Sequence, residues 1–280
     1  MVGILPASSR WHEEGAARVE ETTEGGAEED AVKLELEGKV TLVTGAGRGI
    51  GAAIAVELAE EGASVAVLDR PGDEGAAEVA ARIEQLGIRG LPLGYDVTDY
   101  EGAGRAVAEV RQTLGRLDIL VCNAGITRDG ASWKMSEQAW DEVLAVNLKG
   151  CFNYCRAAGA LFKAQGSGKI VNISSINGMR GKFGQSNYAA SKAGIIALSK
   201  TLARELGRYG VNVNVVAPGM VLTEMVQQLP QEFIDKAAEE TVLGRLASPR
   251  DIARAVAFLC SERSRHITGE VIRVDGGQYI

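Results

Sequence analysis

The chain is poor in the residues that most often hold metals or staple small folds. It has only two histidines and four cysteines, and the cysteines follow no disulfide-scaffold spacing (His12, His266, Cys122, Cys151, Cys155, Cys260). Cys151 and Cys155 are four residues apart, but companion ligands are missing, so the sequence predicts no metal site. Buried, reduced thiols in a cytoplasmic protein are the expected state.

Long apolar runs and an excess of basic residues are also absent. No apolar run reaches the roughly 18 residues that a membrane-spanning helix needs, so no membrane association is expected. The net charge is −7, yet residues 1–30 hold eight acidic and two basic residues, which leaves about −1 for the remainder. A nearly neutral folded part has no basic surface for nucleic acid.

Composition changes sharply along the 280 residues. Residues 1–35 are acidic, rich in small polar residues and without apolar periodicity, which predicts a disordered tail. This tail lacks the basic and apolar regions of a secretory signal. Residues 36–280 are expected to form one domain.

Within that domain, short apolar runs alternate with helical patterns. The predicted strands are 40–44, 64–69, 90–95, 117–122, 169–175, 211–217 and 270–274; the predicted helices are 52–61, 74–86, 100–114, 136–163, about 188–209 and 249–261. Such alternation predicts an α/β fold with a single Rossmann-type, doubly wound parallel sheet of about seven strands and helices on both faces.

A glycine-rich turn follows the first predicted strand. Gly45, Gly49 and Gly51 lack side chains, so the backbone can approach a pyrophosphate whose charge rests on the next helix N-terminus. The alternative is a tight strand–helix turn that binds nothing. Its place in the alternating pattern favours a dinucleotide site.

Two carboxylates end the next two strands. Asp69 stands where a carboxylate hydrogen-bonds the ribose 2′-hydroxyl of NAD, which favours NAD(H). Arg48 and Arg70 lie near and keep NADP(H) open. Asp96 is expected either to receive the adenine amino group or to cap the turn that follows it.

Tyr188 and Lys192 are four residues apart at the start of a predicted helix and therefore share a face. A neighbouring ammonium lowers the pKa of a phenol, which makes the phenol a usable general acid and base. The spacing alone also occurs by chance on solvated helices.

From about Lys39 onward the chain resembles the short-chain dehydrogenase/reductase family, and within it the 3-oxoacyl-[acyl-carrier-protein] reductases. The matching segments are 44–51 (TGAGRGIG), 122–129 (CNAGITRD), Asn147, Ser175, 188–192 (YAASK), 218–219 (PG), 244–245 (GR), 267–270 (ITGE) and 274–277 (VDGG). Cys122 stands where the family usually has asparagine.

The resemblance implies a role for each matching residue. Tyr188 would protonate the substrate carbonyl, Lys192 would lower the phenol pKa, Ser175 would hold the substrate oxygen, and Asn147 would position a water in a relay to Lys192. The cofactor would be bound by Tyr188 and Lys192 and by residues at the ends of several strands. These are Gly45, Arg48, Gly49, Ile50 and Gly51 in the glycine-rich turn, Asp69, Asp96 and Val97 at the ends of the second and third strands, Asn123, Ala124 and Gly125 after the fourth strand, and Pro218, Gly219, Val221 and Thr223 after the sixth.

Three functions are compatible with these residues. The first is reduction of a 3-oxoacyl thioester of acyl-carrier-protein or coenzyme A, and the second is NAD-dependent oxidation of a small secondary alcohol, diol or sugar, which Asp69 favours. The third is a non-catalytic nucleotide-binding scaffold, against which the complete catalytic set argues. Reductases of this kind typically use NADPH, and their carrier-protein arginines are only partly matched, with a neutral 165–168 segment but Arg208 near one expected position.

The resemblance further implies a homotetramer packed through helices around Cys151 and Leu198. Residues 222–243 are expected to form a substrate lid. Arg128, Arg180 and Lys182 lie on loops that should rim the pocket, where they either bind a substrate phosphate or remain solvated.

Overall fold

The computed structural model describes Leu34 and residues 36–280. The predicted acidic tail falls almost entirely on residues outside this range. The described chain forms one parallel sheet with strand order β3-β2-β1-β4-β5-β6-β7. The strands are β1 (Val40–Thr44), β2 (Ser64–Asp69), β3 (Gly90–Gly94), β4 (Ile119–Cys122), β5 (Gly168–Ile173), β6 (Val211–Pro218) and β7 (Val271–Val274). The predicted doubly wound sheet is confirmed.

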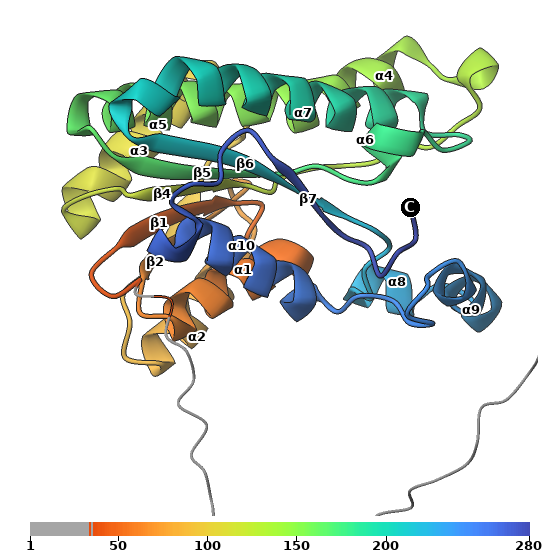
Figure 1. Ribbon diagram of the computed structural model, residues 1–280, viewed down its shortest axis with the longest axis horizontal. Coiled ribbons are helices and arrows are strands. Elements are labelled where there is room, and N and C mark those ends of the chain that lie inside the picture. The colour runs from red at the N-terminus through yellow and green to blue at the C-terminus, as the bar shows by residue number, and fades with distance from the viewer. Residues whose placement is uncertain (1–33, 35) are drawn as a thin grey trace, which may run out of the picture. The chain divides into compact units, whose positions relative to one another are not determined.

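Helices cover both faces of the sheet (Figure 1). On one face lie α1 (Gly49–Glu60), α2 (Gly75–Gln85) and α10 (Pro249–Cys260); on the other lie α3 (Tyr100–Leu114), α5 (Gly150–Gln165) and α7 (Ser186–Leu206). Each face has its own apolar core, with Ile54 and Val256 in one and Tyr154 and Phe162 in the other. None of the described helices is both long and apolar enough to cross a membrane.

The predicted helix over 136–163 is wrong in detail. It is divided into α4 (Glu137–Val143), the wider π-helical turn η2 (Leu144–Lys149) and α5. Asn147 lies in η2 and is fully buried, with its amide bonded to Ile126 and Ser191. These tertiary hydrogen bonds compensate for the irregular turn. The local helix propensity of the sequence does not indicate such a turn.

Four short elements, two after strands β4 and β5 and two after helices α7 and α10, were largely unpredicted. They are η1 (Ser132–Lys134), α6 (Asn177–Arg180), η3 (Gly207–Tyr209) and η4 (Glu262–Ser264). The predicted lid holds two helices, α8 (Glu224–Gln227) and α9 (Gln231–Glu239). Strand β5 ends at Ile173, so Ser175 lies in the turn beyond the strand instead of ending it.

Candidate active site

The glycine turn lies where the strand order reverses, between β1 and β4. A Cβ on Gly51 would collide with the Gly45 carbonyl and lie 2.5 Å from Asn123 Nδ2. Gly45 has φ +63°, and a Cβ there would lie 2.7 Å from Ala124 Cα. Asn123 Nδ2 donates to the Gly45 carbonyl at 2.8 Å and so fastens the turn to the end of β4. The turn is therefore shaped by close backbone packing, and α1 starts at Gly49, three residues earlier than predicted.

Asp69 is held at the end of β2 with its carboxylate facing this turn. Oδ2 accepts from Gly47 N and Oδ1 accepts from Arg70 N, both at 2.9 Å, and the residue is 8% exposed. Arg48 and Arg70 point instead to Asp73, at 3.3 and 3.8 Å. The acidic group thus occupies the inner position, and both arginines are paired beside it.

The other predicted cofactor residues gather at the same edge of the sheet. Val97 is buried after β3, and Pro218 ends β6. Thr223 directly precedes α8, and its methyl group lies 3.7 Å from where a Gly49 Cβ would be. Ile50 is the second residue of α1, and Gly219 N donates to Val274 O on β7. Asp96 Oδ1 instead accepts from Thr98 N and Oγ1, both at 2.8 Å, which is the turn-capping alternative.

The catalytic candidates Ser175, Tyr188 and Lys192 converge from the β5 turn and one face of α7. Ser175 is 7% exposed, and its hydrogen bond to the Tyr188 phenol acts to lower the pKa of that phenol. Lys192 Nζ donates to Ile173 O at 2.9 Å and lies 5.6 Å from the Tyr188 ring centre. The predicted Tyr–Lys face is therefore present, with the serine beside it.

Burial dominates the electrostatics of this group. It raises the pKa of Tyr188 above its ordinary value, and the charge of Asp129 adds to that rise. Burial also lowers the pKa of Lys192 to about 8. Desolvation disfavours both charged forms, and it sets the direction of the Tyr188 pKa shift here in place of the lowering expected from Lys192.

Asn147 lies beside Lys192. A Cβ built on Gly125 would be 3.4 Å from both Asn147 Oδ1 and Lys192 Nζ. Asn147 Oδ1 accepts from Ile126 N at 2.8 Å, and Nδ2 donates to Ile126 O and to Ser191 Oγ. The side chain fixes the 123–126 segment against α7, and the water relay remains a prediction.

Sequence reasoning missed a polar chain beside the phenol. Asn177 Nδ2 donates to Gln185 Oε1 at 3.0 Å, and Gln185 Nε2 donates to Asp129 Oδ2 at 2.9 Å. The fully buried Asn187 accepts from Tyr188 N at 2.7 Å. Gln185 and Asn187 both precede Tyr188 closely in sequence, but polar residues at a helix start are common, so only their burial distinguishes them.

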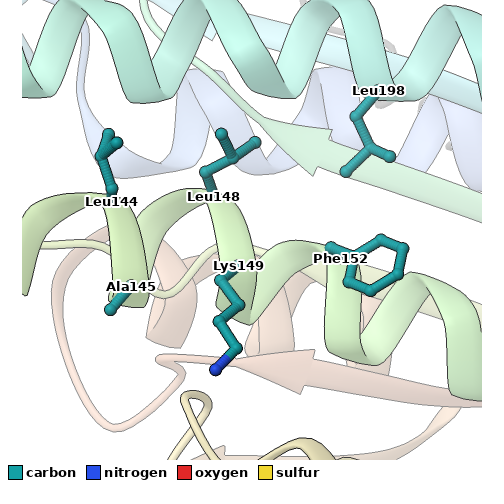
Figure 2. Close-up of a pocket in the computed structure, with 6 residues that line it drawn as sticks. All are labelled: Leu144, Ala145, Leu148, Lys149, Phe152 and Leu198. Carbon is teal, nitrogen blue, oxygen red and sulfur yellow. The ribbon is translucent and has the colours of Figure 1, made fainter. Parts of the chain in front are cut away.

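An apolar pocket in the described part of the chain lies away from these residues. Figure 2 shows Leu198 of α7 extending toward Phe152 of α5, with Leu144 and Leu148 of η2 beside them and Lys149 pointing away. Its wall is almost wholly apolar, unlike the strand-end site, whose Asp69, Ser175 and Lys192 are polar.

Residues 45–278 match the family model described as Enoyl-(Acyl carrier protein) reductase. The chain belongs to the short-chain dehydrogenase/reductase family. It is accordingly an NAD(P)-dependent oxidoreductase. The resemblance inferred from the motifs is confirmed.

The chain is similar to three known proteins over nearly the whole length of each. The chain is 44% identical over 242 residues to 3-oxoacyl-[acyl-carrier-protein] reductase FabG of Staphylococcus aureus strain Mu50, covering 86% of this chain and 98% of the relative. It is 43% identical over 247 residues to the FabG of Thermotoga maritima, covering 88% and 100%. It is 45% identical over 260 residues to (3R)-3-hydroxyacyl-CoA dehydrogenase of Mus musculus, covering 89% and 100%.

The residues present fit the nicotinamide dinucleotide that this family uses. The Gly45–Gly51 turn leaves no room for a side chain at Gly45 or Gly51 and lies at the N-terminus of α1, where a pyrophosphate is stabilised. Asp69 offers a fixed acceptor at the β2 end, and Lys192 an ammonium near the phenol. These groups would hold the two ends of the dinucleotide.

Proposed function

We propose that the protein reduces 3-oxoacyl thioesters to their 3-hydroxyacyl forms. The observation that carries this proposal is the buried Ser175–Tyr188–Lys192 group at the strand ends. Whole-length similarity to two 3-oxoacyl-[acyl-carrier-protein] reductases and to a 3-hydroxyacyl-CoA dehydrogenase selects the substrate class.

The chemistry requires a proton for the substrate oxygen, while the bound nicotinamide cofactor supplies the hydride. Tyr188 donates that proton, and its raised pKa keeps the phenol protonated at neutral pH. Ser175 donates a hydrogen bond to the same oxygen as negative charge develops there. Lys192 keeps a positive charge near the phenol up to about pH 8 and stabilises the phenolate that remains.

The thioester portion would lie along a rim that is part apolar and part basic. Trp133 and Phe183 are 75% and 83% exposed and pack edge to face, with ring centres 6.3 Å apart. Arg180 reaches the lid, where Glu240 lies 3.7 Å away, whereas Lys182 is exposed. We infer that the aromatic pair contacts the acyl chain and that Arg180 and Lys182 attract the phosphates of its carrier.

Arg128, predicted with them, forms an ion pair with Glu142 at 3.0 Å. Like Arg180, which pairs with Glu240, it is therefore already paired with a carboxylate before any phosphate binds. If the double variant Arg180→Ala, Lys182→Ala left the KM for acetoacetyl-CoA unchanged, the proposal that this rim binds phosphate would be wrong. The proposal that the protein reduces the thioester would still stand.

A thioester of acyl-carrier-protein and one of coenzyme A present the same reacting carbonyl. Lys163, Arg204 and Arg208 line a surface pocket with Tyr209, and such a basic cluster suits an acidic carrier protein. We infer that both carriers are accepted. Loss of carrier-protein turnover in Arg204→Glu, with acetoacetyl-CoA turnover retained, would support this pocket as the docking site.

The competing function is NAD-dependent oxidation of a small secondary alcohol, diol or sugar, and the fixed Asp69 favours it. A steady-state comparison separates the two. Acetoacetyl-CoA and a set of free diols and sugars are each assayed with NADH or NAD and with NADPH or NADP, using Tyr188→Phe as the blank. Turnover of acetoacetyl-CoA well above every alcohol supports the thioester reductase; the reverse order overturns it.

We also propose a homotetramer in a reducing, cytoplasmic environment. The apolar pocket of Figure 2, between α5 and α7, suits packing against a second copy of the chain. Phe152→Arg should then reduce the mass in light scattering, while Arg156→Ala on the same helix should not.

All four cysteines are free thiols, which suits a reducing compartment.

A further inference from the structure

Three cysteines converge behind the active site. Cys122 ends β4, while Cys151 and Cys155 lie one turn apart on α5. Cys155 Sγ is 3.8 Å from Cys122 Sγ and 3.9 Å from Cys151 Sγ, and all three sulfurs lie within 4.8 Å of one another. Sequence spacing shows only the Cys151–Cys155 pair, so the third sulfur is a product of the fold.

These separations match those of a metal–thiolate site. Around a metal about 2.3 Å from each sulfur, the sulfur–sulfur edges are about 3.8 Å in a tetrahedral set and about 4.0 Å in a trigonal one. Two of the three edges have these lengths already, so binding needs little rearrangement. Two packed thiols can also lie this far apart, so it is the convergence of three buried sulfurs at one point that indicates a site.

The surroundings decide which metal fits. Each cysteine is at most 6% exposed, and Cys155 Sγ also contacts Asn172 Oδ1 at 3.4 Å. No histidine or carboxylate belongs to this cluster in the described part of the chain. Three soft ligands in a dry environment, without a strong fourth donor, favour Cu(I) over ions that require oxygen or a complete tetrahedron.

A positive charge lies close by. The buried Lys192 ammonium interacts electrostatically with Cys151 and Cys122. Sulfurs that bind as thiolates release their protons to solvent, and the resulting anionic complex is partly balanced by this ammonium. The site needs no change in oxidation state.

We propose that Cys122, Cys151 and Cys155 form a buried binding site for Cu(I). The expectation of no metal site rested on missing companion ligands for Cys151 and Cys155, and Cys122 is such a ligand. The proposal is independent of the substrate of the enzyme.

The test uses the full-length, reduced protein and Cu(I) itself as the probe, under anaerobic conditions with the chromophoric competitor bicinchoninate. We expect one Cu(I) per chain to be withheld from the competitor. X-ray absorption should show sulfur as the only near ligand, at about 2.3 Å. Failure to withhold Cu(I) from the competitor, or a first shell of nitrogen or oxygen, overturns the proposal.

Substitutions of single cysteines test which residues bind the copper ion. Cys122→Asn places there the asparagine usual in the family and should fold, as judged by circular dichroism; Cys155→Ser provides a second test. Each should weaken Cu(I) binding by on the order of 100-fold or more, because a direct ligand is lost. Cys260→Ser is the matched control, because Cys260 is an equally buried thiol outside the cluster, and it should bind as wild type. If Cys122→Asn and Cys155→Ser both bound Cu(I) as tightly as wild type, the copper would lie elsewhere and the proposal would be overturned.

Discussion

Lys192 Nζ donates a hydrogen bond to the Ile173 carbonyl at 2.9 Å, so the ammonium is held against the last residue of β5. The side chain is 3% exposed, and burial lowers its pKa from 10.5 to about 8. A difference of this size corresponds to about 3 kcal/mol of destabilisation while the group is charged. The buried Lys192 ammonium therefore costs stability at neutral pH.

Lys192→Met should accordingly stabilise the protein at pH 7 while abolishing reduction. The lost bond to Ile173 offsets about 1 kcal/mol, so a net gain of about 2 kcal/mol in the free energy of unfolding is expected. Because the unfolded lysine binds a proton that the folded one has released, wild type gains stability as pH rises from about 8 to 10.5. The advantage of the variant should therefore shrink across that window.

Denaturant unfolding of both proteins between pH 7 and 10.5 measures this difference. Lys200→Met is the control, because Lys200 is an exposed lysine of the same helix and should change stability by no more than about 0.5 kcal/mol. A variant no more stable than wild type at pH 7 would show that the buried ammonium is compensated.

The pH dependence of reduction should follow the same lysine. Tyr188 stays protonated because burial raises its pKa, so the phenol is available as the acid through pH 9. Lys192 loses its charge above about pH 8, and kcat for acetoacetyl-CoA should fall there. Ser175→Ala should lower kcat by about 10²- to 10³-fold and leave the inflection in place. A profile flat to pH 10 would contradict the assignment.

Gly51 should tolerate no side chain. A Cβ there would collide with the Gly45 carbonyl, which is backbone and cannot move aside cheaply. Gly51→Ala should lose stability by about 1–3 kcal/mol and abolish the fluorescence change on NADH binding. Gly104→Ala, within α3 and with nothing within 4 Å of the added Cβ, should instead gain about 0.5–1 kcal/mol. Thermal unfolding and NADH titration of both variants test this contrast.

The sheet could be predicted from sequence because each strand is a short apolar run bounded by turn residues. β1, β2 and α3 begin and end as the pattern predicts. The π-helical turn at Asn147 could not be predicted, since its cause is a set of hydrogen bonds to Ile126 and Ser191, which are distant in sequence.

The candidate site divides in the same way. Residues with a motif spacing, such as Tyr188 and Lys192, could be placed on one helix face from the sequence. The interest of Gln185 and of the Cys122 thiol could not be predicted, because it depends on contacts formed by folding. Gln185 contacts Asp129, and Cys122 contacts Cys155. The pKa of Tyr188 is raised by burial, which is a property of the whole fold and not of the spacing between Tyr188 and Lys192.

Asp69 is the residue on which cofactor choice should depend. We propose NAD(H) as the preferred cofactor, because a fixed carboxylate accepts from a ribose hydroxyl and repels a 2′-phosphate. Asp69→Ala removes the repulsion and leaves Arg48 and Arg70 nearby, so NADPH should become usable. The ratio of kcat/KM for NADH to that for NADPH should fall at least tenfold, or about 1.4 kcal/mol.

Two further variants separate charge from architecture. Asp69→Asn keeps an oxygen that can accept from Gly47 N, so it should shift the ratio in the same direction while retaining thermal stability. Asp96→Ala removes a carboxylate that bonds only Thr98 among the described side chains, and it should leave the ratio unchanged. If neither Asp69 variant gained NADPH turnover, cofactor choice would not depend on this carboxylate. A shift with Asp96→Ala instead would place the discriminating contact at the end of β3.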